Sequence, residues 1–418
     1  QASRYARPLT SHSEPMNFPL LSVEFLSLSV AAIALLAALN GIPRQIAFLA
    51  VNVLFLWGLL LGPQGASSTI VFCVLGYVLV RFILRYPRLG FWIALCVYVG
   101  LFVYMRRYDF LSWVVPDEML TRALSTIGLS FLFFKVVHVM IDARSGTLGT
   151  LQFYSFANYC LNFTTFVMGP IQRYQDFHSQ WSGVKEAIPL TFEAHLDAVV
   201  RIFAGLVKIY ILSVWFEGMA LRSNTDLLEL SFIGLFVQVY AFYFFLYLNF
   251  SGYCDVVIGV GSLMGVKPPE NFNWPFVAQN ISDFWLRQHR SLTLWLTDYV
   301  FSPSYKWALT NRLLSSHPVL AINGALMITM LVSGLWHGTT LSFFLFGVAH
   351  GLFLVVYRTW DALLVQKFGA AKVRAWRMRW PVRLSGIAIT FNATAFAFIF
   401  FRLDTAQIEK VLSRFVHL

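Results

Sequence analysis

Charged residues are scarce in this sequence. Only 12% of its 418 residues are Asp, Glu, Lys or Arg, compared with roughly 25% in ordinary soluble domains. Hydrophobic residues make up 58% of the chain, and phenylalanine alone occurs 41 times. A soluble fold could not bury that much apolar surface, so lipid must cover much of it. The composition therefore excludes an ordinary soluble protein and indicates a polytopic membrane protein.

Cysteine is also rare and scattered. The four cysteines are Cys73, Cys96, Cys160 and Cys254, and no two of them form a CxxC pair. Three lie inside apolar runs, where cysteine behaves as a small hydrophobic residue. This spacing favours neither a disulfide framework nor a zinc site. We expect no metal and no other bound cofactor.

Long apolar runs, by contrast, are abundant. Eleven segments approach the roughly 20 residues that a helix needs to cross a bilayer. They lie near residues 20–39, 46–62, 66–84, 91–105, 124–141, 151–168, 197–221, 230–250, 319–335, 340–357 and 384–401. We therefore predict an all-α fold with about eleven transmembrane helices. Residues 1–15 are expected to form a polar N-terminal tail, and residues 16–418 a single membrane-embedded domain whose first span is not a cleaved signal.

One short segment holds much of the positive charge. Residues 358–383 contain seven basic residues and a single acid, Asp361, within a net charge of +11 for the whole chain. Short basic loops stay on the cytoplasmic side of the membrane and are attracted to anionic lipid headgroups. We predict a cytoplasmic loop here, followed by the last helix at 384–401. Nucleic-acid binding is not expected, because no separate domain surrounds the loop.

Another segment is aromatic but too charged to cross lipid unaided. Residues 271–301 combine charged side chains, among them Asp283, with Trp285 and other aromatic residues. Such a segment lies at membrane depth only where protein or a water-filled cavity surrounds it. We predict a re-entrant or interfacial element, with short helices rather than a span.

The stretch from 318 to 357 has no Lys, Arg, Asp or Glu, yet it carries His337 and His350. An ionisable side chain at membrane depth is costly and so indicates a functional site. His337 lies between Trp336 and Gly338, at a break between two apolar runs. His350 follows thirteen residues later and is predicted to point in a different direction, so we assign it to helix packing.

Four motifs follow one another along the chain. They are Gly169-Pro170-Ile171-Gln172-Arg173-Tyr174, Asn249-Phe250-Ser251-Gly252-Tyr253-Cys254-Asp255, Asn280-Ile281-Ser282-Asp283-Phe284-Trp285-Leu286-Arg287-Gln288-His289-Arg290-Ser291-Leu292 and Gly334-Leu335-Trp336-His337-Gly338. In this order they resemble the membrane-bound O-acyltransferase (MBOAT) superfamily over roughly residues 127–401. Within it the chain is similar to the bacterial branch that transfers D-alanyl groups to teichoic acid or acetyl groups to alginate.

The resemblance implies a multi-pass enzyme of the bacterial cytoplasmic (inner) membrane, with a catalytic core at about 127–357. It implies helices around a central tunnel and acyl transfer from a cytoplasmic thioester, either acyl-CoA or an acyl-carrier protein, to a hydroxyl on an extracytoplasmic glycan. The expected partners are membrane lipids, the acyl carrier, and an extracytoplasmic SGNH-type or single-pass protein. By the same resemblance His337 is the catalytic histidine and His289 the second family histidine.

The chemistry of such a transfer needs a base for the hydroxyl proton, and histidine suits this role near neutral pH. The catalytic prediction is therefore His337 with His289. Residues predicted to bind substrate are Asp255, Arg173, Asp283, Trp336, Trp285 and Tyr253. For Asp255 an ion pair with an arginine is an equal alternative, for Arg173 a helix anchor is favoured, and for His289 an interfacial polar network remains open.

Two other functions remain open from the residues alone. Intramembrane His and Asp also mark proton paths, so a proton-coupled transporter is one alternative. The chain shows no internal repeat at a fixed period, which weakens the transporter alternative. The other alternative is a non-catalytic scaffold that recruits an extracytoplasmic transferase.

Overall fold

The computed structural model of the protein describes residues 21–113, 115–116, 127–182, 191–221, 230–312 and 314–416. Within these ranges every regular element is helical and no β-strand occurs. The all-α prediction is therefore confirmed. The predicted polar tail, residues 1–15, lies outside the described residues.

Eight helices in the described ranges are long and apolar enough to cross a membrane. Two of them are continued by π-helical turns and one by a 3-10 turn. The eight are α2 (Gly41–Leu54) with η2 (Phe55–Leu60), α3 (Gly62–Arg85), α4 (Leu89–Arg106), α9 (Phe192–Val207) with η4 (Lys208–Ser213) and α10 (Val214–Met219), α11 (Phe232–Leu263), α15 (Pro318–His337), α16 (Leu341–Phe368), and α18 (Trp380–Ala397) with η7 (Phe398–Phe401).

The other helices are shorter. Helix α1 (Val23–Ala37) is apolar but has only 15 residues. The rest are η3 (Asp109–Trp113), α6 (Leu129–Ser145), α7 (Phe153–Leu161), α8 (Tyr174–Ser182), η5 (Pro275–Val277), α12 (Ile281–Arg287), α13 (Arg290–Leu296), η6 (Thr297–Phe301), α14 (Ser302–Thr310), α17 (Ala370–Arg377) and α19 (Thr405–Val416). The membrane architecture is thus confirmed, whereas the count of eleven spans is not.

The predicted span near 151–168 is wrong. Helix α7 has nine residues and ends at Leu161, far short of the length needed to cross a bilayer. The apolar side chains of this segment, such as Phe156 and Phe163, are fully buried in protein. The Lys135 ammonium of α6 donates to the Tyr159 carbonyl at 3.0 Å, so a buried charge meets the end of α7. High hydropathy here reflects a protein core rather than a lipid contact.

The predicted loop at 358–383 is mostly helical. Helix α16 continues to Phe368, a turn at Gly369 with φ of +81° follows, and α17 and α18 take up the next residues. Six of the seven basic residues therefore lie on helices, and Arg379 lies in the turn between α17 and α18. Val373 of α17 packs inward. The predicted last helix at 384–401 is also not the last, because α19 follows it and buries Ile408 and Val411.

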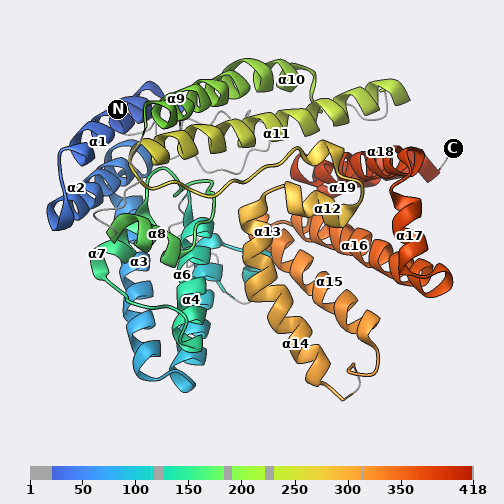
Figure 1. The fold of residues 1–418 in the computed structure, drawn as a ribbon, viewed down its shortest axis with the longest axis horizontal. Helices are drawn as coiled ribbons and strands as arrows, with labels where there is room; N and C mark the ends of the chain where they lie inside the picture. The colour runs from blue at the N-terminus through green and yellow to red at the C-terminus, as the bar shows by residue number, and fades with distance from the viewer. Residues whose placement is uncertain are drawn as a thin grey trace.

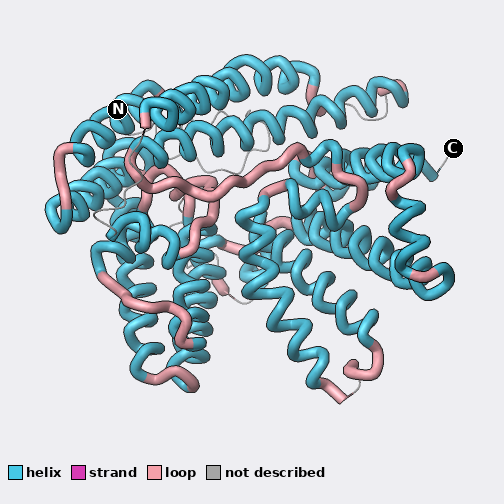
Figure 2. The backbone as a smooth tube through the Cα atoms, viewed as in Figure 1, coloured by secondary structure: helices cyan, strands magenta, loops and turns pink. Residues whose placement is uncertain are grey.

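Figure 1 shows how these helices are arranged. Helices α9, α10 and α11 run along one edge of the molecule, α3, α4 and α6 extend from it on one side, and α13 to α15 extend from its middle. The C-terminal helices α16 to α19 gather on the other side. In Figure 2 the loop that joins α11 to α12 crosses the middle of the molecule before the short helices begin.

Close helix crossings hold this arrangement together. A Cβ on Gly252 of α11 would lie 2.8 Å from the carbonyl oxygen of Gly205 on α9. A Cβ on Gly334 of α15 would lie 2.9 Å from the amide nitrogen of Gly347 on α16. Glycine is needed at both positions because any side chain would separate the backbones, as at other close contacts between membrane helices.

Candidate active site

The polar segment predicted at 271–301 is built from short helices, as expected. Helices α12 and α13 have seven residues each, so neither can span a bilayer. The Asn280 side chain caps α12 by accepting from the Asp283 amide at 2.9 Å. Phe284 of α12 and Leu292 of α13 are fully buried. Protein therefore covers one face of this element, whereas Leu286 and Leu294 on its other face are exposed. Packing against protein allows irregular backbone among membrane helices.

His289 joins α12 to α13 and is held in one orientation. Its backbone has φ of +46°, an uncommon conformation for a residue with a side chain. Its Nδ1 lies 3.2 Å from Oδ1 of Asn271. That oxygen also accepts the Ser291 amide at 3.1 Å and the Ser291 hydroxyl at 2.9 Å, so it is an acceptor. Nδ1 of His289 must then donate, which leaves the Nε2 lone pair of the neutral ring available.

His337 is the last residue of α15. Gly338 follows in an extended conformation, and a Cβ there would lie 2.0 Å from the Phe343 ring. The imidazole is partly exposed and packs edge-on against Phe401, with ring centroids 4.9 Å apart. Its nitrogens form no hydrogen bond within the described part of the chain. His337 is thus a fixed ring whose polar atoms are still available.

Trp336 lies between the two histidines. Its ring centroid is 5.9 Å from that of His289 and 4.6 Å from that of His337. The two imidazole centroids are therefore no farther apart than the sum of these distances. The indole Nε1 donates to the Ser130 carbonyl at 3.2 Å, which fixes the ring against α6. The structure brings together three of the predicted residues, which are His289, Trp336 and His337.

The first motif, residues 169–174, is linked to His289 by hydrogen bonds. The Ile171 amide donates to the Ser291 hydroxyl at 2.9 Å, and Ser291 in turn donates to Asn271. A continuous set of hydrogen bonds thus joins the segment at 169–174 to the residue that orients His289. Motifs separated by about a hundred residues in sequence meet at one point.

Asp255 and Tyr253 have partners elsewhere. Both oxygens of Asp255 are paired, with Arg201 Nε at 3.0 Å and Lys208 Nζ at 2.6 Å. The Arg201 guanidinium also binds Glu270, and these hydrogen bonds lower the pKa of the Glu270 carboxyl. The Tyr253 hydroxyl donates to the Thr164 carbonyl at 2.9 Å. The second motif therefore fastens α11 to its neighbours, which corresponds to the ion-pair alternative for Asp255.

Arg173 and Asp283 are also paired within the protein. Arg173 Nη2 lies 2.6 Å from Asp298, and the guanidinium covers the Tyr299 ring at 4.5 Å. Asp283 accepts from Arg287 Nε at 2.7 Å and from the Gln279 amide at 3.1 Å. Neither charge forms an ion pair or hydrogen bond with His289 or His337 among the described residues.

Trp285 and His350 form a separate buried contact. Their ring centroids are 5.1 Å apart, and neither the Trp285 indole nitrogen nor either nitrogen of His350 has a hydrogen-bond partner. The Phe346 ring contacts both His350 and His337. Its centroid lies 4.4 Å from that of His350 and 5.6 Å from that of His337. His337 ends α15, whereas His350 lies on α16. The sequence-based comparison of their directions assumed one continuous helix and so does not apply.

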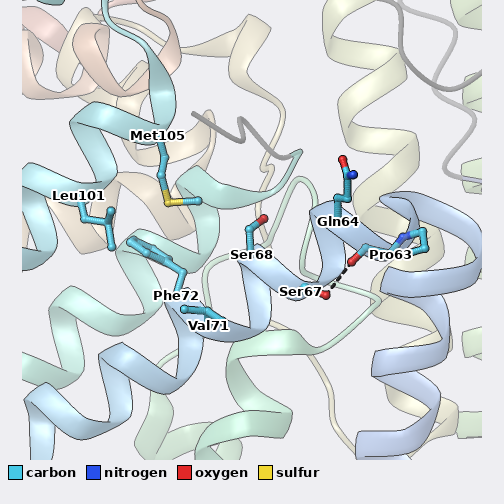
Figure 3. Close-up of a pocket in the computed structure, with 8 residues that line it drawn as sticks. All are labelled: Pro63, Gln64, Ser67, Ser68, Val71, Phe72, Leu101 and Met105. Carbon is cyan, nitrogen blue, oxygen red and sulfur yellow. Dashed lines mark hydrogen bonds between the residues drawn. The ribbon is translucent and has the colours of Figure 1, made fainter. Parts of the chain in front are cut away.

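A cavity of about 520 Å³ lies away from this group, between α3 and α4. Leu101 and Met105 of α4 face Val71 and Phe72 of α3 there (Figure 3). The hydroxyl of Ser67 on its wall donates to the Pro63 carbonyl at 2.7 Å, which leaves few polar atoms for a ligand. It includes none of the predicted site residues.

No group of three or more metal-ligating side chains occurs among the described residues. The groups with acid–base chemistry near Trp336 are the two imidazoles, and Asn271 orients one of them. Asn271 was missed by the sequence analysis, because it lies eighteen residues before His289 in a loop without periodicity. The only sequence signal was its position at the start of the aromatic, charged segment.

Comparison with known proteins shows the family to which this chain is related. The family model described as MBOAT, membrane-bound O-acyltransferase family, matches residues 65–400. The chain is 28% identical over 384 residues to the teichoic acid D-alanyltransferase of Bacillus subtilis, covering 90% of this chain and 89% of that protein.

Two further relatives modify other polymers. The chain is 30% identical to the probable alginate O-acetylase of Pseudomonas aeruginosa, over 78% of this chain and 58% of that protein. It is 29% identical to the peptidoglycan O-acetyltransferase of Helicobacter pylori, over 67% of this chain and 50% of that protein. With eight long apolar helices among its described residues, the chain is a multi-pass acyltransferase of a bacterial inner membrane and belongs to the membrane-bound O-acyltransferase family.

Proposed function

We propose that this enzyme moves an acetyl or D-alanyl group from a cytoplasmic thioester to a hydroxyl on an extracytoplasmic glycan or on a partner protein. The observation that carries the proposal is the packing of two imidazoles against Trp336, each with a nitrogen that has no hydrogen bond to the described residues. Acyl transfer to a hydroxyl needs such a base, and a neutral imidazole supplies it.

The proton balance of the reaction assigns a role to each ring. His337 removes the proton from the acceptor hydroxyl as its oxygen attacks the thioester carbonyl. The tetrahedral intermediate then breaks its carbon–sulfur bond, and the thiolate leaves with the proton that His337 returns. His289 orients the acceptor by accepting, through its Nε2, from a hydroxyl other than the one that reacts, because its Nδ1 proton is donated to Asn271. Ester and free thiol are the products, so no oxidant or metal enters the balance.

The two substrates enter from opposite sides in this proposal. The donor, an acyl-CoA or an acyl-carrier protein, approaches from the cytoplasm near the basic helices at 358–383, where positive charge attracts phosphate groups. The acceptor approaches from the other face, directly or through an SGNH-type or single-pass partner protein. The printed activities of the relatives, D-alanyl transfer and O-acetylation, supply the two acyl groups to be tested.

Reconstitution tests the reaction class and the acyl group together. Proteoliposomes receive acetyl-CoA, acetyl-carrier protein or D-alanyl-carrier protein on one side, with teichoic acid, alginate or peptidoglycan fragments on the other. Thioester loss is followed by free thiol release, and acyl transfer by mass spectrometry of the acceptor. We expect one donor to give both products in equal amounts, and His337→Ala to give neither.

A matched control separates chemistry from folding. His195 on α9 is exposed, so His195→Ala removes a histidine remote from Trp336 and should leave transfer unchanged. Transfer that persists in His337→Ala would exclude this residue as the base. Thiol release without acylated acceptor, for every acceptor supplied, would contradict direct transfer and favour a partner protein as the acceptor.

A further inference from the structure

A second cavity, which none of the predicted site residues lines, lies between α16, α17 and α18 and the start of α12. Its volume is about 730 Å³, within the roughly 300–1,000 Å³ typical of ligand-binding clefts. Its walls are mostly apolar, with Phe353 and Val356 on α16 facing Ile389 and Ala393 on α18. These helices are the C-terminal ones on one side of Figure 1.

The wall of this cavity is open to the surroundings of the protein. Val356 is 66% exposed and Ile389 is 70% exposed, although both line it. Both residues lie on helices long enough to cross the membrane, where exposed apolar side chains contact lipid. The compound that reaches this cavity most readily is therefore a lipid from the bilayer.

One end of the cavity is basic and aromatic. Arg377 and Arg383 line it together with Trp360 and Trp376. Tryptophan is enriched where membrane helices meet the polar headgroup region. Asp361 pairs with Arg377 and so offsets one positive charge. The Arg383 guanidinium is exposed and has no ion pair or hydrogen bond among the described residues, which leaves a positive charge at the mouth.

We propose that this cavity binds one anionic phospholipid, with an acyl chain between α16 and α18 and its phosphate at Arg383. Basic pockets between membrane helices are suited to anionic headgroups, and the apolar wall is suited to the chain. Lys372 and Arg374 on α17 add positive charge nearby without lining the cavity. The site is distinct from the proposed acyl-transfer site, and the inference does not depend on the identity of the acyl donor.

The bound lipid would support the element that carries His289. Gln279 and Asn280 also line the cavity, and the Asn280 side chain caps α12. A Cβ on Gly386 of α18 would lie 2.5 Å from the Gln279 carbonyl oxygen. The backbone of α18 is therefore in close contact with the residue that precedes this cap. Filling the space beside α18 should therefore stabilise α12 and raise the melting temperature of the whole protein.

Native mass spectrometry of the intact protein tests the proposal, with phosphatidylglycerol and phosphatidylcholine of identical chains as probes. We expect one phosphatidylglycerol to bind at least fivefold more tightly than phosphatidylcholine, as one headgroup contact to a basic residue would give. Arg383→Gln should abolish this preference. Ala393→Trp, which fills the cavity, should prevent the binding of either lipid.

Arg374→Gln removes the same charge from a position outside the cavity and should leave the preference intact. Equal binding of the two lipids by the wild type would overturn the proposal, and so would equal effects of Arg374→Gln and Arg383→Gln. Melting curves identify any variant that fails to fold, in which case Ser385→Trp replaces it as the filling variant. Displacement of phosphatidylglycerol by a lower concentration of acyl-CoA would assign the cavity to the donor instead and would also overturn it.

Discussion

Two polar clusters, each built around histidine, lie on either side of one aromatic stack. The Phe134 ring stacks on Trp295 at 4.0 Å and on Trp336 at 5.2 Å, so it separates them. On one side His138 contacts the Tyr159 hydroxyl through Nε2 at 2.6 Å and the Asp142 carboxylate through Nδ1 at 3.4 Å. On the other side are His289 and His337.

The difference lies in the number of hydrogen bonds that each ring makes. Both nitrogens of His138 have partners, and Asp142 also accepts from Tyr299 at 3.0 Å and from Gln175 at 2.7 Å. His289 uses one nitrogen only, and His337 uses none within the described residues. A ring whose nitrogens are both occupied cannot take up a substrate proton without breaking a buried hydrogen bond, which is costly. Burial alone does not distinguish the two clusters, whereas free lone pairs do.

The largest effect should come from His337→Gln. Glutamine keeps a polar side chain of similar length but cannot accept and return a proton near neutral pH, so transfer should fall by about 10²- to 10⁴-fold. The measurement is acyl transfer per folded molecule in proteoliposomes, with the melting temperature as a control. A fall of less than tenfold would mean that the free lone pair of His337 is not used in the reaction.

A smaller effect is expected at Asn271. Asn271→Ala removes the acceptor of the His289 Nδ1 proton. The ring then turns, and transfer should fall roughly 10- to 100-fold through misplacement of a reacting group. Asn271→Asp distinguishes a role in orienting His289 from a merely structural role, because only the former should change the pH dependence of transfer. A carboxylate beside Nδ1 favours the protonated imidazole and raises the pKa of His289.

The sign of the pH effect follows from that shift. Only the neutral imidazole of His289 can accept through Nε2 from a hydroxyl that orients the acceptor, and a higher pKa keeps the ring protonated up to a higher pH. The acidic limb of the pH–rate profile should therefore move to higher pH in Asn271→Asp, while Asn271→Ala lowers the rate without that displacement. An unchanged acidic limb would mean that Nε2 of His289 does not bind the acceptor.

In the other cluster, His138→Phe should affect stability instead of chemistry. The substitution removes one hydrogen-bond partner each from the Tyr159 hydroxyl, the Asp142 carboxylate and the Tyr174 amide in the interior, at a cost of about 1–3 kcal/mol. We expect a lower melting temperature in detergent, with transfer per folded molecule unchanged. A selective loss of transfer at full stability would show that the two clusters are coupled through the Phe134 stack.

The comparison also shows what sequence reasoning could reach. Composition and run length predicted the all-α membrane architecture, because the lipid environment constrains every span in the same way. The segment at 151–168 misled the analysis, since apolar runs look alike whether lipid or protein covers them. Three-dimensional contact alone revealed that Phe156 and Phe163 are core residues.

The candidate site was predictable only in part. His289, Trp336 and His337 were assigned from motifs, and the structure brings them together. Asn271 could not be found, because its contact with His289 depends on how the loop after α11 crosses the molecule (Figure 2). The pairing of Asp255 was left open for a similar reason, since Arg201 lies on another helix.

The smallest effect is expected from His350→Leu, which tests the assignment of this ring to packing. Both of its nitrogens are buried without a partner, which costs about 1–3 kcal/mol for an unsatisfied polar group. Leucine has a similar volume and needs no hydrogen bond, so the melting temperature should stay constant or rise, and transfer should persist. Loss of transfer comparable to that in His337→Gln would mean that a substrate group or a proton occupies His350 during turnover. In that case the two histidines of the charge-free stretch would form one site across Phe346, and an unpaired nitrogen would mark a substrate contact even in a fully buried ring.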